Sequence, residues 1–314
     1  MRRLLAAVVL AGALAAAAGC SAPAPGHRAR PPVTYYLSLG DSLARGVQPD
    51  ADGASVPTPH GYPDQPYAAL RPRHPGLRLV KLGCPGETTA TMINGGICRY
   101  PGGSQLAAAT RFLRAHRLRV WLVTLDIGAN DPGSCLTRPS LAKLATCVRQ
   151  VIPHATANLT AILTRLRQAD PHGRIMAMNY YLPALAQWRG GLPGHAVARL
   201  AEIAAAGYSG LLTDTYRRFG IRVADVFTAF HTGDFGDPVT VPGYGRLPRN
   251  VAAICLWTWE CAPPPRGPNQ HANQAGYQVI ARTFERAGLY ADPEKGSPHR
   301  RFSIKNWPQG PVLP

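Results

Sequence analysis

Five short runs of β-branched, aliphatic and aromatic residues alternate with segments of helical periodicity, and this alternation limits the fold more than any other feature. The runs are VTYYLSLG, LRLVKLGC, VWLVTLDIG, RIMAMNYYL and IRVADVF. Strands that alternate with helices pair in parallel, because each helix carries the chain back across the sheet, and the helices then cover both faces. We therefore predict one three-layer α/β/α domain over residues 33–290, around a central, mainly parallel five-stranded sheet. Helices are expected over 64–70, 104–116, 139–168, 193–219 and 273–287.

The first residues, MRRLLAAVVLAGALAAAAGC, have the layout of an export signal. Two arginines precede an uncharged apolar run, and small residues follow it. We predict a signal peptide over residues 1–19 and a Pro/Ala-rich linker over 20–32. The AAGC ending resembles a bacterial lipobox, in which Cys20 is lipidated and tethers the domain to a membrane. Two outcomes stay open: a membrane-anchored lipoprotein or a freely secreted protein, both extracytoplasmic.

Besides Cys20 the chain has six cysteines, an even number that in an exported chain favours disulfides over thiol chemistry. They fall into three close couples, and we predict the sequential pairs Cys84–Cys98, Cys135–Cys147 and Cys255–Cys261. A zinc site is disfavoured, because the sequence contains no C-x-x-C and no histidine pair with ligand spacing. We expect neither a metal nor another cofactor.

The formal net charge is +17, and arginine supplies most of the basic residues. Such a charge favours anionic lipid headgroups or cell-wall polymers, although a general arginine bias in composition explains it equally well. Nucleic acid is disfavoured as a partner. The basic residues are scattered along the chain, and an exported protein is separated from the nucleic acid of the cell. The tail over 291–314 is basic and proline-rich, and we expect it to wrap the surface or to be loose. We expect a monomer.

Three predicted strands end in residues that carry chemistry. The first ends in GDSL with Ser42, the second in CPGET with Gly86, and the third in GAND with Asn130, while His271 precedes the last helical segment. The carboxyl ends of parallel strands meet at one edge of a sheet, where ligands bind. Taken singly each residue has a plain structural explanation: a helix N-cap, a turn glycine, a loop asparagine and an ordinary histidine.

Together, in this order, the four blocks resemble those of the SGNH, or GDSL, hydrolases over essentially all of residues 33–290. The three local cysteine couples also resemble the secreted actinobacterial esterase and lipase branch of that family. The resemblance implies the flavodoxin-like SGNH hydrolase fold, with Ser42 as nucleophile and His271 as base. It also implies an oxyanion hole made of the N–H groups of Ser42 and Gly86 and the side-chain amide of Asn130.

One position departs from the family pattern. Its usual last block is Asp-x-x-His, and here Pro268 occupies the aspartate position. The favoured interpretation is a Ser-His dyad in which the main-chain carbonyl of Pro268 accepts the N–H of His271. Two alternatives stay open: an acid from elsewhere in the fold, or an inactive site. The candidate acids are Asp225, Asp234, Asp237 and Glu260.

These features predict an extracytoplasmic serine esterase that forms an acyl-enzyme on Ser42. The polar, proline-rich segment after the nucleophile predicts an open entrance, which favours small or sugar-linked esters over long-chain lipids. The leading alternative is a cell-surface binding module that kept the SGNH fold and lost the chemistry. A metal-dependent hydrolase is a third interpretation, which nothing in the chain favours.

Overall fold

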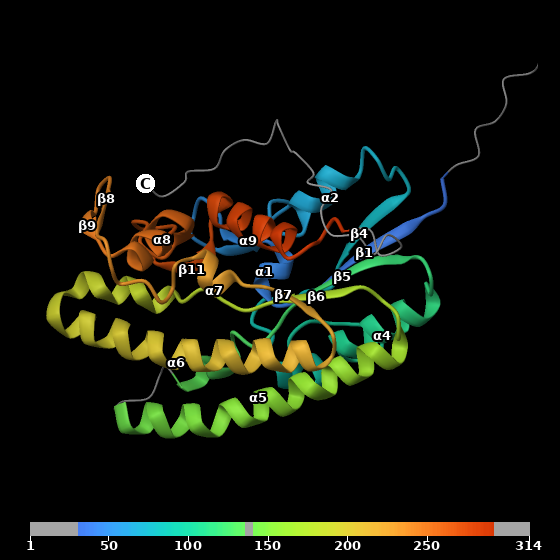
Figure 1. Cartoon of the computed structure of the whole chain (residues 1–314), viewed down its shortest axis with the longest axis horizontal. Coiled ribbons are helices and arrows are strands. Elements are labelled where there is room, and N and C mark those ends of the chain that lie inside the picture. The colour runs from blue at the N-terminus through green and yellow to red at the C-terminus, as the bar shows by residue number, and fades with distance from the viewer. Residues whose placement is uncertain (1–30, 136–140, 292–314) are drawn as a thin grey trace, which may run out of the picture. The chain divides into compact units, whose positions relative to one another are not determined.

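The computed structural model describes residues 31–135 and 141–291, and from Pro32 onward these belong to one compact unit. A five-stranded sheet runs through the unit in the order β4-β1-β5-β6-β7, and every pair of neighbours is parallel. The strands are β1 (Thr34–Gly40), β4 (Leu77–Lys81), β5 (Val120–Asp126), β6 (Ile175–Met178) and β7 (Arg222–Ala224). They coincide with the five predicted runs, so the predicted sheet is confirmed (Figure 1).

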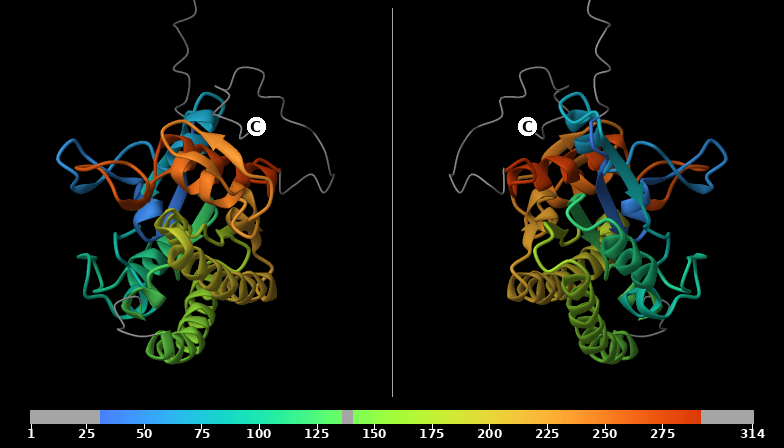
Figure 2. Two further views of the ribbon diagram at one scale, coloured as in Figure 1. Left: turned by 90° about the vertical axis from the view of Figure 1, so that its left-hand side faces the viewer. Right: turned by 90° about the vertical axis from the view of Figure 1, so that its right-hand side faces the viewer.

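Helices cover both faces of the sheet (Figures 1 and 2). Successive side chains of a strand point to opposite faces, so Tyr36 packs in one core cluster and Leu37 in the other. The first cluster lies under α2 (Asp64–Leu70), α7 (Val226–Ala229), α8 (Arg249–Trp257) and α9 (Gln274–Arg286). The second lies under α3 (Thr89–Asn94), α4 (Gln105–Ala115), α5 (Leu141–Ala169) and much of α6 (Gly191–Arg218). The three predicted layers are therefore confirmed.

Each of the five predicted helical segments is a helix, and local sequence explains where two of them begin. The hydroxyl of Ser104 accepts the N–H of Ala107 before α4, and the side chain of Asn273 accepts the N–H of Gly276 before α9. The sequence did not predict α8. Most of its residues are buried, so it lacks the apolar and polar faces that mark a surface helix.

Several short elements were also not predicted. Two 3₁₀ segments, η1 (Asp131–Cys135) and η2 (Pro183–Gly190), and the four-residue α1 (Ser42–Arg45) follow strands of the sheet. Three antiparallel pairs lie outside the sheet: β2 (Val47–Pro49) with β3 (Ser55–Pro57), β8 (Val239–Val241) with β9 (Gly245–Leu247), and β10 (Thr258–Trp259) with β11 (Asn269–Ala272).

Two of the predicted disulfides are present, Cys84–Cys98 and Cys255–Cys261, with Cα atoms 6.0 and 4.9 Å apart. The predicted pair of Cys135 and Cys147 depends on side chains outside the described part of the chain. Cys20, the predicted signal peptide and all but the ends of the predicted linker and tail also lie outside it. Among the described helices, none is both long and apolar enough to span a membrane.

Candidate functional site

The turn between β1 and α1 carries the predicted nucleophile. Gly40 ends β1 at φ 130°, and a Cβ there would lie 1.9 Å from the main-chain oxygen of Asp126, so only glycine fits. The carboxylate of Asp41 caps α1 by accepting the N–H of Leu43 at 2.9 Å. Ser42 is therefore the first residue of α1, and it is 7% exposed. Among the described residues, neither its hydroxyl nor its N–H has a hydrogen-bond partner.

The loops after β4 and β5 carry the other two predicted oxyanion donors. Gly86 is exposed at φ 79°, and its N–H has no partner among the described residues. Asn130 donates one amide hydrogen to the main-chain oxygen of Glu87 at 2.9 Å, which leaves its second hydrogen for a ligand. The N–H of Cys84 donates to the oxygen of Gly40 at 3.0 Å. These bonds tie the three donor-bearing loops together at one edge of the sheet.

Gln105 and the side chain of Glu87 also support this edge, and the sequence analysis missed both. Gln105 accepts the N–H of Gly40 at 2.6 Å and donates to the main-chain oxygen of the same residue at 2.8 Å. It also donates to the carboxylate of Glu87 at 3.0 Å. Because all three groups are buried, these bonds fix the backbone just before the nucleophile. Gln105 is the first residue of α4, and polar residues are ordinary in an amphipathic helix, so the sequence did not mark it.

The predicted base, His271, lies in β11, and its ring is oriented by an asparagine. Its Nδ1 lies 2.7 Å from the side-chain oxygen of Asn269, which also accepts the N–H of His271 at 3.1 Å. An amide oxygen only accepts, so Nδ1 carries the hydrogen and Nε2 is left as the proton acceptor. The predicted acceptor was the carbonyl of Pro268, and the structure differs by one residue: the hydrogen bond goes to the side chain of its neighbour.

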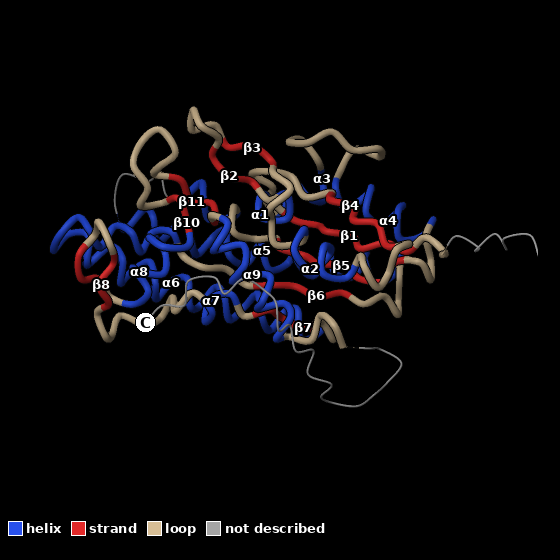
Figure 3. Tube along the Cα trace, turned by 90° about the horizontal axis from the view of Figure 1, so that it is seen from above, coloured by secondary structure: helices blue, strands red, loops and turns tan. Residues whose placement is uncertain are grey.

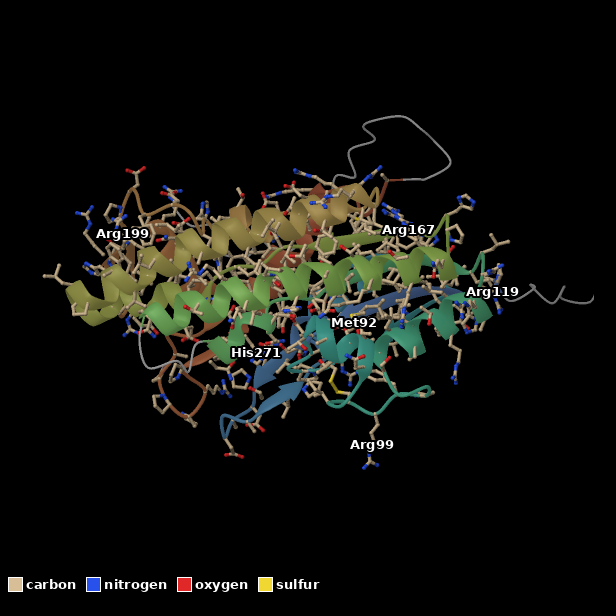
Figure 4. The ribbon with its side chains drawn as sticks, turned by 90° about the horizontal axis from the view of Figure 1, so that it is seen from below. Met92, Arg99, Arg119, Arg167, Arg199 and His271 are labelled. Atoms are coloured by element: carbon tan, nitrogen blue, oxygen red, sulfur yellow. A yellow bond between two sulfur atoms is a disulfide. The ribbon has the colours of Figure 1, made fainter. Side chains whose placement is uncertain are left out.

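Asn269 is itself held by the β2–β3 hairpin. Its amide nitrogen donates to the hydroxyl of Ser55 in β3 at 3.0 Å. Close by, the indole of Trp259 donates to Gln48 in β2 at 3.3 Å. Figures 3 and 4 show β10, β11 and His271 beside this hairpin. The segment after the nucleophile thus folds back against the strand that carries the base.

Burial sets the charge state of the base, because it lowers the pKa of His271 to about 4. None of the four candidate acids forms a hydrogen bond or ion pair with His271 in the described part of the chain. Asp225 caps α7 and accepts from Asn179, and Asp234 pairs with Arg249 at 3.5 Å. His271 is consequently neutral near pH 7, as a general base must be.

The strand that carries His271 packs beside α1, where Ser42 lies. The strand β11 is also held by Tyr181, which follows β6. The hydroxyl of Tyr181 donates to the main-chain oxygen of Gln270 at 2.9 Å. No hydrogen bond joins Ser42 and His271 in the structure, although both are among the described residues. In the absence of substrate such bonds are commonly long and tighten only in the complex.

The described residues contain no cluster of three or more His, Cys, Asp or Glu side chains that could hold a metal ion. The site offers a serine hydroxyl, a neutral imidazole and a set of N–H donors. This combination fits nucleophilic acyl transfer.

Known proteins share the fold of this chain. Among curated proteins no sequence match was found. The structure is similar to that of an extracellular lipase from Streptomyces rimosus, with a TM-score of 0.53 and 17% identity over 81% of this chain and 100% of the other. It is also similar to a catalytic mutant of an acetylxylan esterase from Geobacillus stearothermophilus, with a TM-score of 0.50 and 14% identity over 82% of this chain and 95% of the other. At such identities these likenesses show the shared fold.

A family profile matches residues 38–279. This range includes all four sequence blocks and most of the described residues. The chain belongs to the GDSL-like lipase/acylhydrolase family.

Proposed function

We propose that this protein is an extracytoplasmic serine esterase that hydrolyses carboxylic esters through an acyl-enzyme on Ser42. The observation that carries the proposal is the hydrogen bond from His271 to Asn269, on a strand packed beside the nucleophile turn. It fixes the imidazole tautomer that a general base needs, with Nε2 free to take a proton.

In the acylation step, Nε2 of His271 removes the hydroxyl proton of Ser42 as the oxygen attacks the ester carbonyl. The carbonyl oxygen becomes an oxyanion, which accepts hydrogen bonds from the N–H of Ser42, the N–H of Gly86 and the free amide hydrogen of Asn130. Losing one such donor typically costs about 10²- to 10³-fold in rate. His271 then protonates the leaving alcohol.

In the deacylation step, water takes the place of the alcohol. His271 removes one of its protons, the same three donors stabilise the second oxyanion, and the acid leaves as Ser42 regains its proton. The amide oxygen of Asn269 holds the ring through both steps. A neutral amide stabilises the imidazolium less than a carboxylate would, so we expect a lower rate than that of a Ser-His-Asp triad.

For the substrate we propose small or sugar-linked esters. The segment over 47–63 bears exposed polar residues and contains few large apolar ones, and its β2–β3 hairpin is hydrogen-bonded to Asn269, the partner of His271. A series of p-nitrophenyl esters from two to sixteen carbons tests this: we expect kcat/KM to peak at short chains, and a rise beyond ten carbons would contradict it.

The proposed location is outside the cytoplasm. Cys84–Cys98 and Cys255–Cys261 are disulfides of a kind that persists in oxidising compartments. Lipidation of Cys20 would anchor the domain to the membrane. Metabolic labelling with a palmitate analogue checks the anchor, since label should appear on the wild-type protein and disappear in Cys20→Ala.

One observation favours a second candidate, an inactive surface binding module: Ser42 and His271 are not hydrogen-bonded to each other. A fluorophosphonate probe separates the two functions, because it reacts only with an activated serine. We expect an adduct on Ser42 in the wild-type protein and none in Ser42→Ala or His271→Ala. A folded wild-type protein that stays unlabelled would refute the esterase.

A further inference from the structure

Two carboxyl groups are buried directly behind the nucleophile turn. Asp41, before Ser42, is 1% exposed, and Asp126, at the end of β5, is 0% exposed. Their side chains are hydrogen-bonded to each other, and the main-chain N–H of Asp41 donates to the main-chain oxygen of Asp126 at 3.0 Å. The mechanism proposed above uses neither carboxyl group.

The pair divides the free N–H groups of α1 in a specific way. A helix begins with N–H groups that have no partner inside the helix. Asp41 takes the N–H of Leu43 at 2.9 Å, and Asp126 takes the N–H of Ala44 at 3.0 Å. The N–H of Ser42 is left without a partner, and it is the one that the oxyanion needs.

Two tyrosines hold the outer oxygens of the pair. Tyr62 donates to Oδ1 of Asp126 at 3.0 Å, and Tyr180 donates to Oδ2 of Asp41 at 3.3 Å. No lysine or arginine pairs with either carboxyl group among the described residues. The nearby ionisable groups are the tyrosines around the pair and Asp131, whose charge opposes ionisation of Asp41.

Two carboxylates in contact, buried and without a cation, do not both ionise. Burial raises the pKa of Asp41, and burial together with the charge of Asp41 raises the pKa of Asp126 well above its usual range. One proton is therefore shared between the two carboxyl groups and joins them in a hydrogen bond. Asp126 also accepts the N–H of Ala44 and the hydroxyl of Tyr62.

We propose that the carboxyl group of Asp126, paired with that of Asp41, positions the nucleophile turn, so that α1 presents the N–H of Ser42 to the oxyanion. Asp126 works through Asp41 and Ala44 and touches no reacting atom. The inference rests on the proposed esterase function, because it assigns a role in that same site.

The decisive comparison is between two substitutions of nearly equal size. In Asp126→Asn the amide oxygen can accept from Ala44 while the amide nitrogen donates to Asp41, so these two hydrogen bonds of the carboxyl group are kept. Asp126→Leu can do neither, and it leaves the N–H of Ala44 buried and unpaired. We expect Asp126→Asn to keep kcat within about threefold, and Asp126→Leu to lower kcat by about tenfold or more with KM nearly unchanged.

Affinity for a trifluoromethyl ketone provides a readout that a merely structural role does not move, since the bound inhibitor puts a charged oxygen among the oxyanion donors. We expect Asp126→Leu to weaken it by a factor close to the loss in kcat. The matched control is Asn250→Leu. Asn250 is likewise buried and accepts a helix N–H, from Val251 at 2.8 Å, but it lies in α8. This variant should lose stability and keep kcat per folded molecule.

The outcomes separate the two proposals. If folded wild-type protein does not react with a fluorophosphonate, the esterase function fails, and the positioning role fails with it. If wild-type protein reacts and Asp126→Leu matches it in kcat and inhibitor affinity, only the positioning role fails. If Asp126→Leu does not fold, Asp126→Asn decides: kcat within threefold supports the role, and a loss of tenfold or more overturns it.

Discussion

The imidazole Nδ1 of His271 lies 2.7 Å from the side-chain oxygen of Asn269, two residues earlier on the same strand. Residues i and i+2 of a strand point to the same side, so β11 alone is enough to bring the two groups together. The contact replaces the carboxylate that an Asp-x-x-His block would supply. An amide selects the tautomer of the ring without adding charge to the site.

Removing the amide should cost rate through misorientation of the ring. In Asn269→Ala, Nδ1 of His271 has no fixed acceptor, so the ring samples the wrong tautomer and rotamer. We expect kcat to fall by about 10- to 100-fold, less than the roughly 10⁴-fold loss of a triad carboxylate. Steady-state kinetics with a short p-nitrophenyl ester measures this. Gln270→Ala is the control, because the exposed side chain of this neighbouring amide makes no hydrogen bond among the described residues; equal losses in both variants would contradict the assignment.

The acid limb of the activity profile should lie unusually low. Burial lowers the pKa of His271 to about 4, so the base stays unprotonated well below pH 6. We expect kcat/KM to be nearly constant from pH 8 down to about 5 and to be half-maximal near pH 4. Release of p-nitrophenol, read at its isosbestic wavelength, reports the rate across this range. A midpoint near 6.5, the usual value for histidine, would mean that the ring is solvated.

The same pKa fixes the sign of a stability effect. The folded pKa of His271 lies below its unfolded value, so between about pH 6.5 and 4 the unfolded state binds more protons. This group therefore stabilises the fold least at the acid end and contributes no further change above about pH 6.5. His271→Gln should remove the effect. As the pH falls from about 6.5 to 4, the Tm of the wild-type protein should therefore fall more than the Tm of the variant.

A charged partner should reverse the low pKa. In Asn269→Asp a carboxylate faces Nδ1, and the attraction favours the imidazolium. The midpoint of the acid limb should move up by at least about one pH unit, while kcat at pH 8 stays equal to or above that of the wild-type protein. Comparing the two pH profiles measures the shift. An unmoved midpoint would show that Asn269 does not face the ring in solution.

The four candidate acids should be dispensable for catalysis. Asp225 caps α7, Asp234 pairs with Arg249, and none of the four forms a hydrogen bond or ion pair with His271 among the described residues. We expect kcat for each single amide variant, Asp225→Asn, Asp234→Asn, Asp237→Asn and Glu260→Gln, to stay within about tenfold of wild type. Thermal unfolding of each variant distinguishes a loss of fold from a loss of chemistry. A fall of about 10⁴-fold in a folded variant would identify a distant triad acid.

The sheet and the order of the four blocks could be predicted from sequence, because they depend on signals local in the chain. A buried parallel strand is a run of apolar residues, and the direction of each strand follows from the helix before it. Once the strands are known, Ser42, Gly86 and Asn130 must lie at one edge of the sheet. His271 joins them because α9 starts just after it.

The partner of His271 could not be predicted in the same way, because it depends on a strand of four residues in a segment dense in proline. The Asp-x-x-His pattern of the family predicts the partner of the histidine at position 268, three residues before it. Had Asn269–Ala272 been recognised as β11, the two-residue period would have indicated Asn269. Asp126 was missed for another reason: at the end of an apolar run a carboxyl group looks like the start of a loop, and only the structure shows it buried against Asp41.

The Cys255–Cys261 disulfide should support activity more than its small loop suggests. It joins α8 to the turn that follows β10, and β10 pairs with the strand that carries His271. In Cys255→Ser with Cys261→Ser, β10 and β11 lose this tie, so we expect kcat to fall about three- to tenfold and Tm to drop by several degrees. Cys84→Ser with Cys98→Ser is a comparison for Tm alone, because it opens the loop that carries the proposed oxyanion donor Gly86. We measure kcat at saturating substrate and well below the Tm of the wild-type protein and of the variant. Unchanged kcat in Cys255→Ser with Cys261→Ser would show that this disulfide only stabilises the fold.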